Sequence, residues 1–173
     1  MTATGTVAQM GTLATHTALS VWTVANDFLI LLIPLIILFL FAWYVGRGPL
    51  VALLLSFYAG YALYAIFPYF SFFPVAPPMT AFLSHVGLYA VLVFLFYLVI
   101  RRVVVSDFLY IGPFGLVLLA LAGTVFLVAL ASHVFLIGSL YQFTPQVAAL
   151  FVPDKFFFWW MSAPIIGLLF FAR

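Results

Sequence analysis

Residues 28–45 read FLILLIPLIILFLFAWYV, and the tetrapeptide GRGP follows at 46–49. The apolar run has about the length that a helix needs to cross the hydrocarbon core of a bilayer. Glycine permits unusual backbone dihedrals and proline suits the first turn of a helix, so the tetrapeptide predicts a tight turn into a second helix. Comparable apolar runs recur along the chain. Together they predict an all-α, polytopic helical membrane protein.

The overall composition excludes a soluble globular domain. Apolar residues make up 69% of the 173-residue chain and charged residues only 5%, whereas soluble domains are about half apolar and about a quarter charged. The net charge of +2 is small and scattered, so we expect no nucleic-acid partner. The chain has no cysteine, which excludes disulfides and thiolate metal sites. The partner that composition predicts directly is the lipid bilayer.

Breaks at glycine, proline and charged residues divide the chain into about five predicted spans, within a range of four to six. The last apolar segment is only just long enough to cross a bilayer and contains Pro164. It is therefore either a fifth span, which we favour, or an interfacial helix. The whole of 27–173 is predicted to be a single transmembrane domain. The five predicted spans cover residues 28–45, 49–67, 80–100, 114–140 and 156–172.

Shorter signals refine these boundaries. Asn26 and Asp27 stand just before the first span, and Thr80 stands just before the third, where each could cap a helix. The last polar loop is predicted to contain a short helix at Pro145–Phe151.

Residues 1–26 form a polar N-terminal segment without Lys or Arg. A signal peptide opens with a basic region, so we expect none here. Apolar positions repeat at three- and four-residue steps between Val7 and Phe28. This spacing indicates a helix on the outer surface or an extension of the first span. Disorder up to about Thr12 is an equal alternative.

The arginines predict the orientation, because basic residues are retained on the cytoplasmic side of a membrane. If the 46–49 turn faces the cytoplasm, Arg173 and the predicted cytoplasmic anchors Arg47, Arg101 and Arg102 all fall on that side. Only Lys155 falls outside. This arrangement predicts an N-terminus outside and a C-terminus in the cytoplasm.

Small residues predict where helices approach each other closely. Ser56 and Gly60 lie four residues apart in the second span and share a helix face. Gly115 and Gly123 offer similar positions in the fourth span. In lipid, small residues at such spacings let helix backbones come together. The sequence therefore predicts helix packing at these four residues.

Two histidines lie within apolar spans, each in the tripeptide Ser-His-Val, at His85 and His133. Ionisable groups inside a membrane are costly and are candidates for function. With Asp27 nearby in the predicted topology, they could form a polar site for a metal, a proton step or a ligand. The alternative, which we favour, is two neutral histidines that hydrogen-bond to a serine, a carbonyl or each other and hold helices together. Neither has a partner at a ligand spacing, so we expect no catalytic set, metal or cofactor.

The order of these features resembles the colicin V production (CvpA) family of small bacterial inner-membrane proteins. The matching positions are Asp27, Gly46-Arg47-Gly48, and Asp107 with Gly112 and Gly115, over roughly residues 27–130. This chain carries less charge and has an additional aromatic apolar segment at its end. The resemblance implies a multi-pass protein of the bacterial cytoplasmic membrane without a known active site.

Three functions follow as expectations. The favoured one is a non-enzymatic accessory or scaffold subunit that packs with other membrane subunits or with itself. The first alternative is an oligomeric channel or small transporter with His85, His133 and the proline-rich 68–78 loop near its outer mouth. The second is a membrane enzyme that uses the outer-leaflet histidines, although the chain has neither Glu nor Cys.

Overall fold

The computed structural model describes residues 25–103, 112–135, 140–141 and 143–171. The regular elements within these ranges are all helical, which confirms the predicted all-α class. The predicted surface helix at the N-terminus, apart from its last residues, and Asp107 lie outside the described residues. In chain order the helices are the first helix (Ala25–Tyr44), α2 (Arg47–Ala65), the 3-10 turn η1 (Phe70–Phe72), α3 (Pro78–Val103), α4 (Pro113–His133), α5 (Pro145–Phe151) and α6 (Asp154–Phe171).

Four helices are long and apolar enough to cross a membrane: the first helix, α2, α3 and α4. Their presence confirms a polytopic helical membrane protein, at the lower end of the predicted range of spans. The predicted fifth span forms α6, an 18-residue helix with Pro164 inside it, and it is not among the four. The short helix predicted at Pro145–Phe151 is confirmed as α5.

Two predicted boundaries were wrong. The fourth span was expected to reach residue 140, but α4 ends at His133. The Phe135 N–H bonds to the Leu130 carbonyl at 3.4 Å, and a bond across five residues is a common closure at a helix C-terminus. Thr80 does not precede the third helix, because α3 already begins at Pro78. Its hydroxyl donates to the Pro77 carbonyl at 2.8 Å instead.

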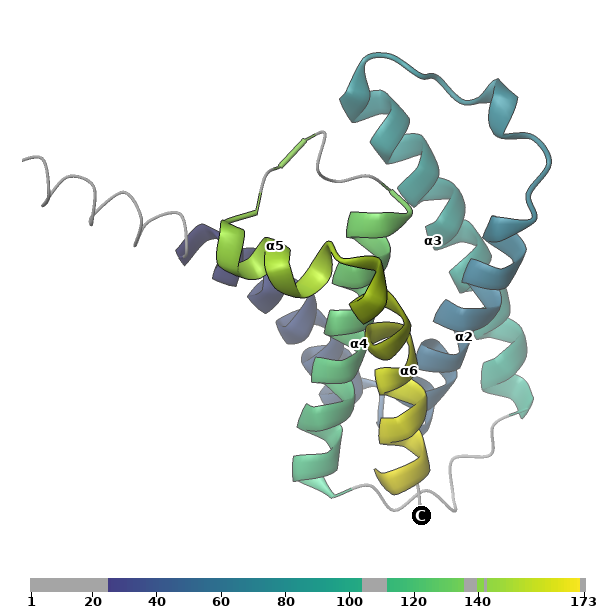
Figure 1. Cartoon of the computed structure of the whole chain (residues 1–173). Coiled ribbons are helices and arrows are strands. Elements are labelled where there is room, and N and C mark those ends of the chain that lie inside the picture. Colours follow the sequence, from purple (N-terminus) through teal and green to yellow (C-terminus); the bar gives the residue numbers. More distant parts are fainter. Residues whose placement is uncertain (1–24, 104–111, 136–139, 142, 172–173) are drawn as a thin grey trace, which may run out of the picture.

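The long helices form an antiparallel bundle (Figure 1). Helix α2 packs along α3, and α4 packs along α6. The core lies between these pairs and the first helix, where the rings of Phe57 and Phe126 stack with centroids 5.8 Å apart. Fully buried leucines from α2 and α4 belong to the same core cluster: Leu50, Leu54, Leu119 and Leu130. Burial of these side chains stabilises the contact of α2 with α4.

Glycines mark the closest helix contacts. A Cβ atom added to Gly60 of α2 would lie 2.8 Å from Val93 Cγ2 and 3.2 Å from the Val93 backbone N on α3. A Cβ atom added to Gly123 of α4 would lie 2.7 Å from Leu54 Cδ2 and 3.0 Å from Leu38 Cδ1. The four residues predicted for helix packing are all buried: Ser56, Gly60, Gly115 and Gly123. At Gly60 and Gly123 the close approach is to helices of the same chain.

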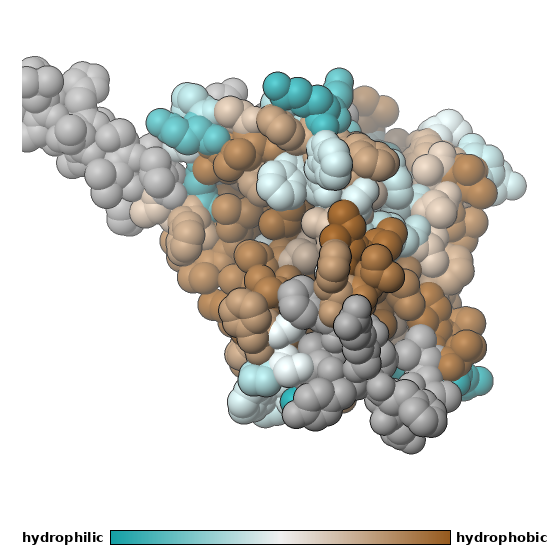
Figure 2. Space-filling model, turned by 60° about the horizontal axis from the view of Figure 1, so that its bottom comes forward, coloured by the Kyte–Doolittle hydropathy of each residue, from teal (hydrophilic) through white to brown (hydrophobic). Residues whose placement is uncertain are grey.

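The two ends of the bundle differ in charge. Since α2 and α3 run antiparallel, Arg47 at the start of α2 lies at the same end as Arg101 and Arg102 in the last turn of α3. Arg101 lies over the Tyr97 ring at 5.9 Å. Asp154 and Lys155 open α6 at the opposite end, where their charges offset each other (Figure 1). Figure 2 shows hydrophobic residues across the middle of the visible face and hydrophilic residues towards its upper and lower edges, as expected for a membrane protein.

Candidate functional site

His85 lies in the second turn of α3, at the end of the bundle where α2 ends and η1 follows. Its Nδ1 is 2.8 Å from the hydroxyl of Tyr64, near the C-terminus of α2. The rings of Phe70 and Phe73 approach the imidazole with centroids 5.5 and 5.4 Å away. The turn that contains η1 thus closes an aromatic enclosure around one polar ring.

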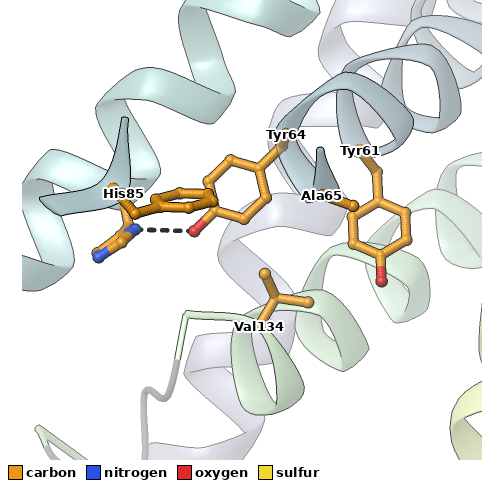
Figure 3. Close-up of a pocket in the computed structure, with 6 residues that line it drawn as sticks. Tyr61, Tyr64, Ala65, His85 and Val134 are labelled. Atoms are coloured by element: carbon orange, nitrogen blue, oxygen red, sulfur yellow. Dashed lines mark hydrogen bonds between the residues drawn. The ribbon is translucent and has the colours of Figure 1, made fainter. Parts of the chain in front are cut away.

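Two adjoining hollows flank His85, with volumes of about 310 and 440 Å³. Figure 3 shows the smaller one, in which His85 and Tyr61 lie on opposite sides of Tyr64. Both hollows are bordered by Phe70, His85 and Val134. The smaller is completed by Tyr61, Tyr64 and Ala65, and the larger by Phe73, Pro74, Val75, Pro78, Ala81, Phe82 and Phe135.

The contact with Tyr64 occupies one ring nitrogen of His85 and leaves the other. When the tyrosine hydroxyl donates to an unprotonated Nδ1, the hydrogen of the neutral ring lies on Nε2. No residue of the described ranges makes a hydrogen bond with His85 Nε2. The enclosure therefore contains one ring nitrogen, Nε2, that the described part of the chain does not use.

His133 ends α4 in a different environment. Its Nδ1 is 3.2 Å from both the Ser132 hydroxyl and the Ala129 carbonyl, and its ring lies 4.4 Å from the Phe157 ring. The Nε2 atom is buried without a hydrogen-bond partner, although it is 3.5 Å from Oδ1 of the fully exposed Asp154. A proton on His133 would complete an ion pair between the end of α4 and the start of α6.

Asp27 is buried, with 1% of its surface exposed. One carboxylate oxygen accepts from the Tyr141 hydroxyl at 2.6 Å. The other accepts from the backbone N–H of Thr144 at 2.8 Å and from its hydroxyl at 2.5 Å. Thr144 is the N-cap of α5, so this carboxylate fastens the first helix to the segment that begins α5. The bond to Asp27, together with the charge of that carboxylate, raises the pKa of the Tyr141 hydroxyl.

The predicted role of Asp27 as a helix cap was wrong. The first helix already includes Ala25 and Asn26, so Asp27 lies inside it rather than before it. Its carboxylate faces a loop more than a hundred residues away in the sequence. Burial explains the difference, because a carboxylate removed from water needs several donors and one loop supplies three.

His85, His133 and Asp27 do not form a single site. His85 contacts Tyr64 on α2, and His133 lies near Asp154 on α6. Asp27 binds Thr144, which precedes α5. Within the described part of the chain, no three His, Asp, Glu or Cys side chains are grouped so that they could hold a metal ion.

Three hydrogen-bond partners of His85 and Asp27 were missed: Tyr64, Tyr141 and Thr144. Tyr61 and Tyr64 follow Phe57 at helical spacing along α2, and this aromatic face was the available signal.

The chain was also compared with known proteins. No family model, curated protein or solved structure matches it. The resemblance to the CvpA family therefore stays a prediction based on the residues quoted above.

Proposed function

We propose that this protein is a non-enzymatic accessory or scaffold subunit of a membrane complex, or a homo-oligomer, in the bacterial cytoplasmic membrane. The observation that carries the proposal is the closed interior of the bundle. The hydroxyls of Ser56 and Thr124 donate to carbonyls one turn back, at 2.6 and 2.9 Å, and Tyr89 donates to the Phe57 carbonyl at 3.0 Å. These polar groups are satisfied within the core.

A closed core argues against solute transport through one copy. A transporter offers polar groups and broken helices to its substrate near the bilayer midplane. Here Thr124 is itself buried, and Phe126 and Leu54 of the same core are fully buried. A pathway would have to run between copies of the chain rather than through one.

The outer faces of two helices favour partner contacts. Only 17% of the most apolar stretch of the first helix is buried, and the value for α3 is the same. On α3 the uncovered face includes Val91, Phe94 and Leu95. A membrane subunit needs such broad faces, since helix association in lipid depends on van der Waals packing across them.

Mass measurement of the full chain tests the proposal. The tagged protein, purified in mild detergent, should carry a fixed set of other chains in constant ratio, or show one oligomeric mass in native mass spectrometry. A clean monomer without partners would contradict both forms of the proposal.

Because the chain has no cysteine, single cysteines can test self-association in native membranes. Cysteine in place of the exposed Leu95 should form disulfide-linked dimers if copies meet at α3. Cysteine in place of the buried Leu92, on the same helix, is the matched control and should not. If Leu95→Cys does not crosslink and no partner chains co-purify, the homo-oligomer with contacts at α3 is excluded.

A further inference from the structure

We propose that the two hollows beside His85 bind an uncharged, apolar molecule from the membrane, whose carbonyl oxygen accepts a hydrogen bond from His85 Nε2. The inference goes beyond the subunit role and does not depend on it. It stands on three features of the enclosure: its size, its lining and the ring nitrogen of His85 that no described residue uses.

The size and lining match those of small-molecule sites. Such sites occupy about 300–1,000 Å³, lie between helices, and are mostly apolar with a few placed polar groups. The hollows here measure about 310 and 440 Å³ and meet at Phe70, His85 and Val134. The remaining lining consists of aromatic rings together with alanine, proline and valine side chains, and Tyr61 adds one hydroxyl.

The polar groups determine the class of ligand. Among the described residues, no Asp or Glu lines either hollow, so an ammonium or metal cation would have no counter-charge from them. The described lining contains no Lys or Arg either, which disfavours a phosphate or carboxylate. In the tautomer that the proposal assigns, Tyr64 donates to Nδ1 and His85 Nε2 carries the hydrogen. A neutral carbonyl oxygen is the acceptor that suits this N–H donor.

The entrance favours a ligand that arrives from the bilayer. The larger hollow is bordered by Val75 and Pro78, and Val75 is 91% exposed. An apolar rim of this kind admits lipid-soluble molecules more readily than water-soluble ones. Two kinds of membrane component carry a neutral carbonyl on an apolar body, namely isoprenoid quinones and acylglycerol esters.

Calorimetric titration of the full-length protein in detergent micelles tests the site with one probe of each kind. The probes are a benzoquinone with a ten-carbon tail and a diacylglycerol with eight-carbon chains. His85→Phe keeps an aromatic ring and removes the donor. Ala81→Trp fills the larger hollow. Ala90→Trp is the matched control on the same helix, because Ala90 is exposed and borders neither hollow.

At least one probe should bind the parent protein beyond its partition into empty micelles, and the probe that binds identifies the source. His85→Phe should weaken binding about tenfold, the effect of one lost hydrogen bond. Ala81→Trp should abolish binding and Ala90→Trp should leave it unchanged. If neither probe binds, if His85→Phe leaves the affinity unchanged, or if binding survives Ala81→Trp, the assignment is wrong. Should Ala81→Trp fail to fold, Ala65→Phe fills the smaller hollow and the exposed Ala62→Phe controls for it.

Discussion

Replacement of Gly60 by alanine should weaken the contact between α2 and α3. The added Cβ atom would lie 2.8 Å from Val93 Cγ2, and 3.2 and 3.3 Å from the backbone N and Cα of Val93. The valine side chain is stiff at χ1, and its backbone moves only if α3 moves. An extra methyl group in a packed contact costs about 1–3 kcal/mol.

A control isolates this steric cost from helix propensity. Gly87 is exposed on α3, and a Cβ atom added there would meet nothing within 4 Å. Both substitutions gain about 1 kcal/mol of helix propensity. We therefore expect Gly60→Ala to be about 1 kcal/mol less stable than the parent protein, and about 2 kcal/mol less stable than Gly87→Ala.

The assay is reversible unfolding in mixed micelles, in which SDS is titrated into a mild detergent and helicity is followed by circular dichroism. A second variant tests the named contact, because Gly60→Ala combined with Val93→Ala removes the Cγ2 atom. The double variant should be more stable than the sum of the single effects predicts. If Gly60→Ala is as stable as Gly87→Ala, the helices do not approach at Val93 and the reasoning fails.

Three further predictions concern the ends of the bundle. Asp27→Ala leaves the Thr144 donors unpaired and should lower the free energy of unfolding by about 3 kcal/mol. Amide hydrogen exchange in α5 should then be faster, and unchanged exchange would contradict this prediction. Because the pKa of Tyr141 is raised, its bond to Asp27 stabilises the fold below the ordinary pKa of about 10 and is lost as pH rises through the folded value. Where Asp27 is ionised, the stability difference between the parent and Tyr141→Phe should therefore be constant up to about pH 10 and shrink above it. For the predicted topology, cysteines introduced at Thr6 and Arg102 should label from opposite sides of the membrane, and labelling from one side refutes it.

The sequence predicted the elements better than their partners. The apolar run at 28–45 and the GRGP turn correspond to the first helix and the start of α2, because length and turn chemistry are local properties. Pro145 correctly indicated the start of α5, since proline suits a first helical turn. The end of α4 at His133 was missed, since residues 134–137 stay apolar and hydropathy alone does not mark a helix end.

At the candidate site too, the sequence predicted the residues better than their partners. His85 was singled out because an ionisable group in an apolar span is conspicuous. Its partner Tyr64 was missed, since the contact depends on how α2 and α3 pack. Asp27 was noticed for its position before the first span, yet the donors that bind it come from Tyr141 and Thr144. No local pattern connects positions so far apart in the chain.

The distance in sequence between Asp27 and its donors has a consequence for biosynthesis. The first helix leaves the ribosome long before residues 141–144 are made, and a carboxylate without donors is costly in an apolar surrounding. Until those residues arrive, water is the only abundant donor for Asp27, so this end of the first helix should remain at the membrane surface. The final third of the chain then completes the placement of the first helix, and a chain that stops before Tyr141 should hold that helix less deeply in the membrane.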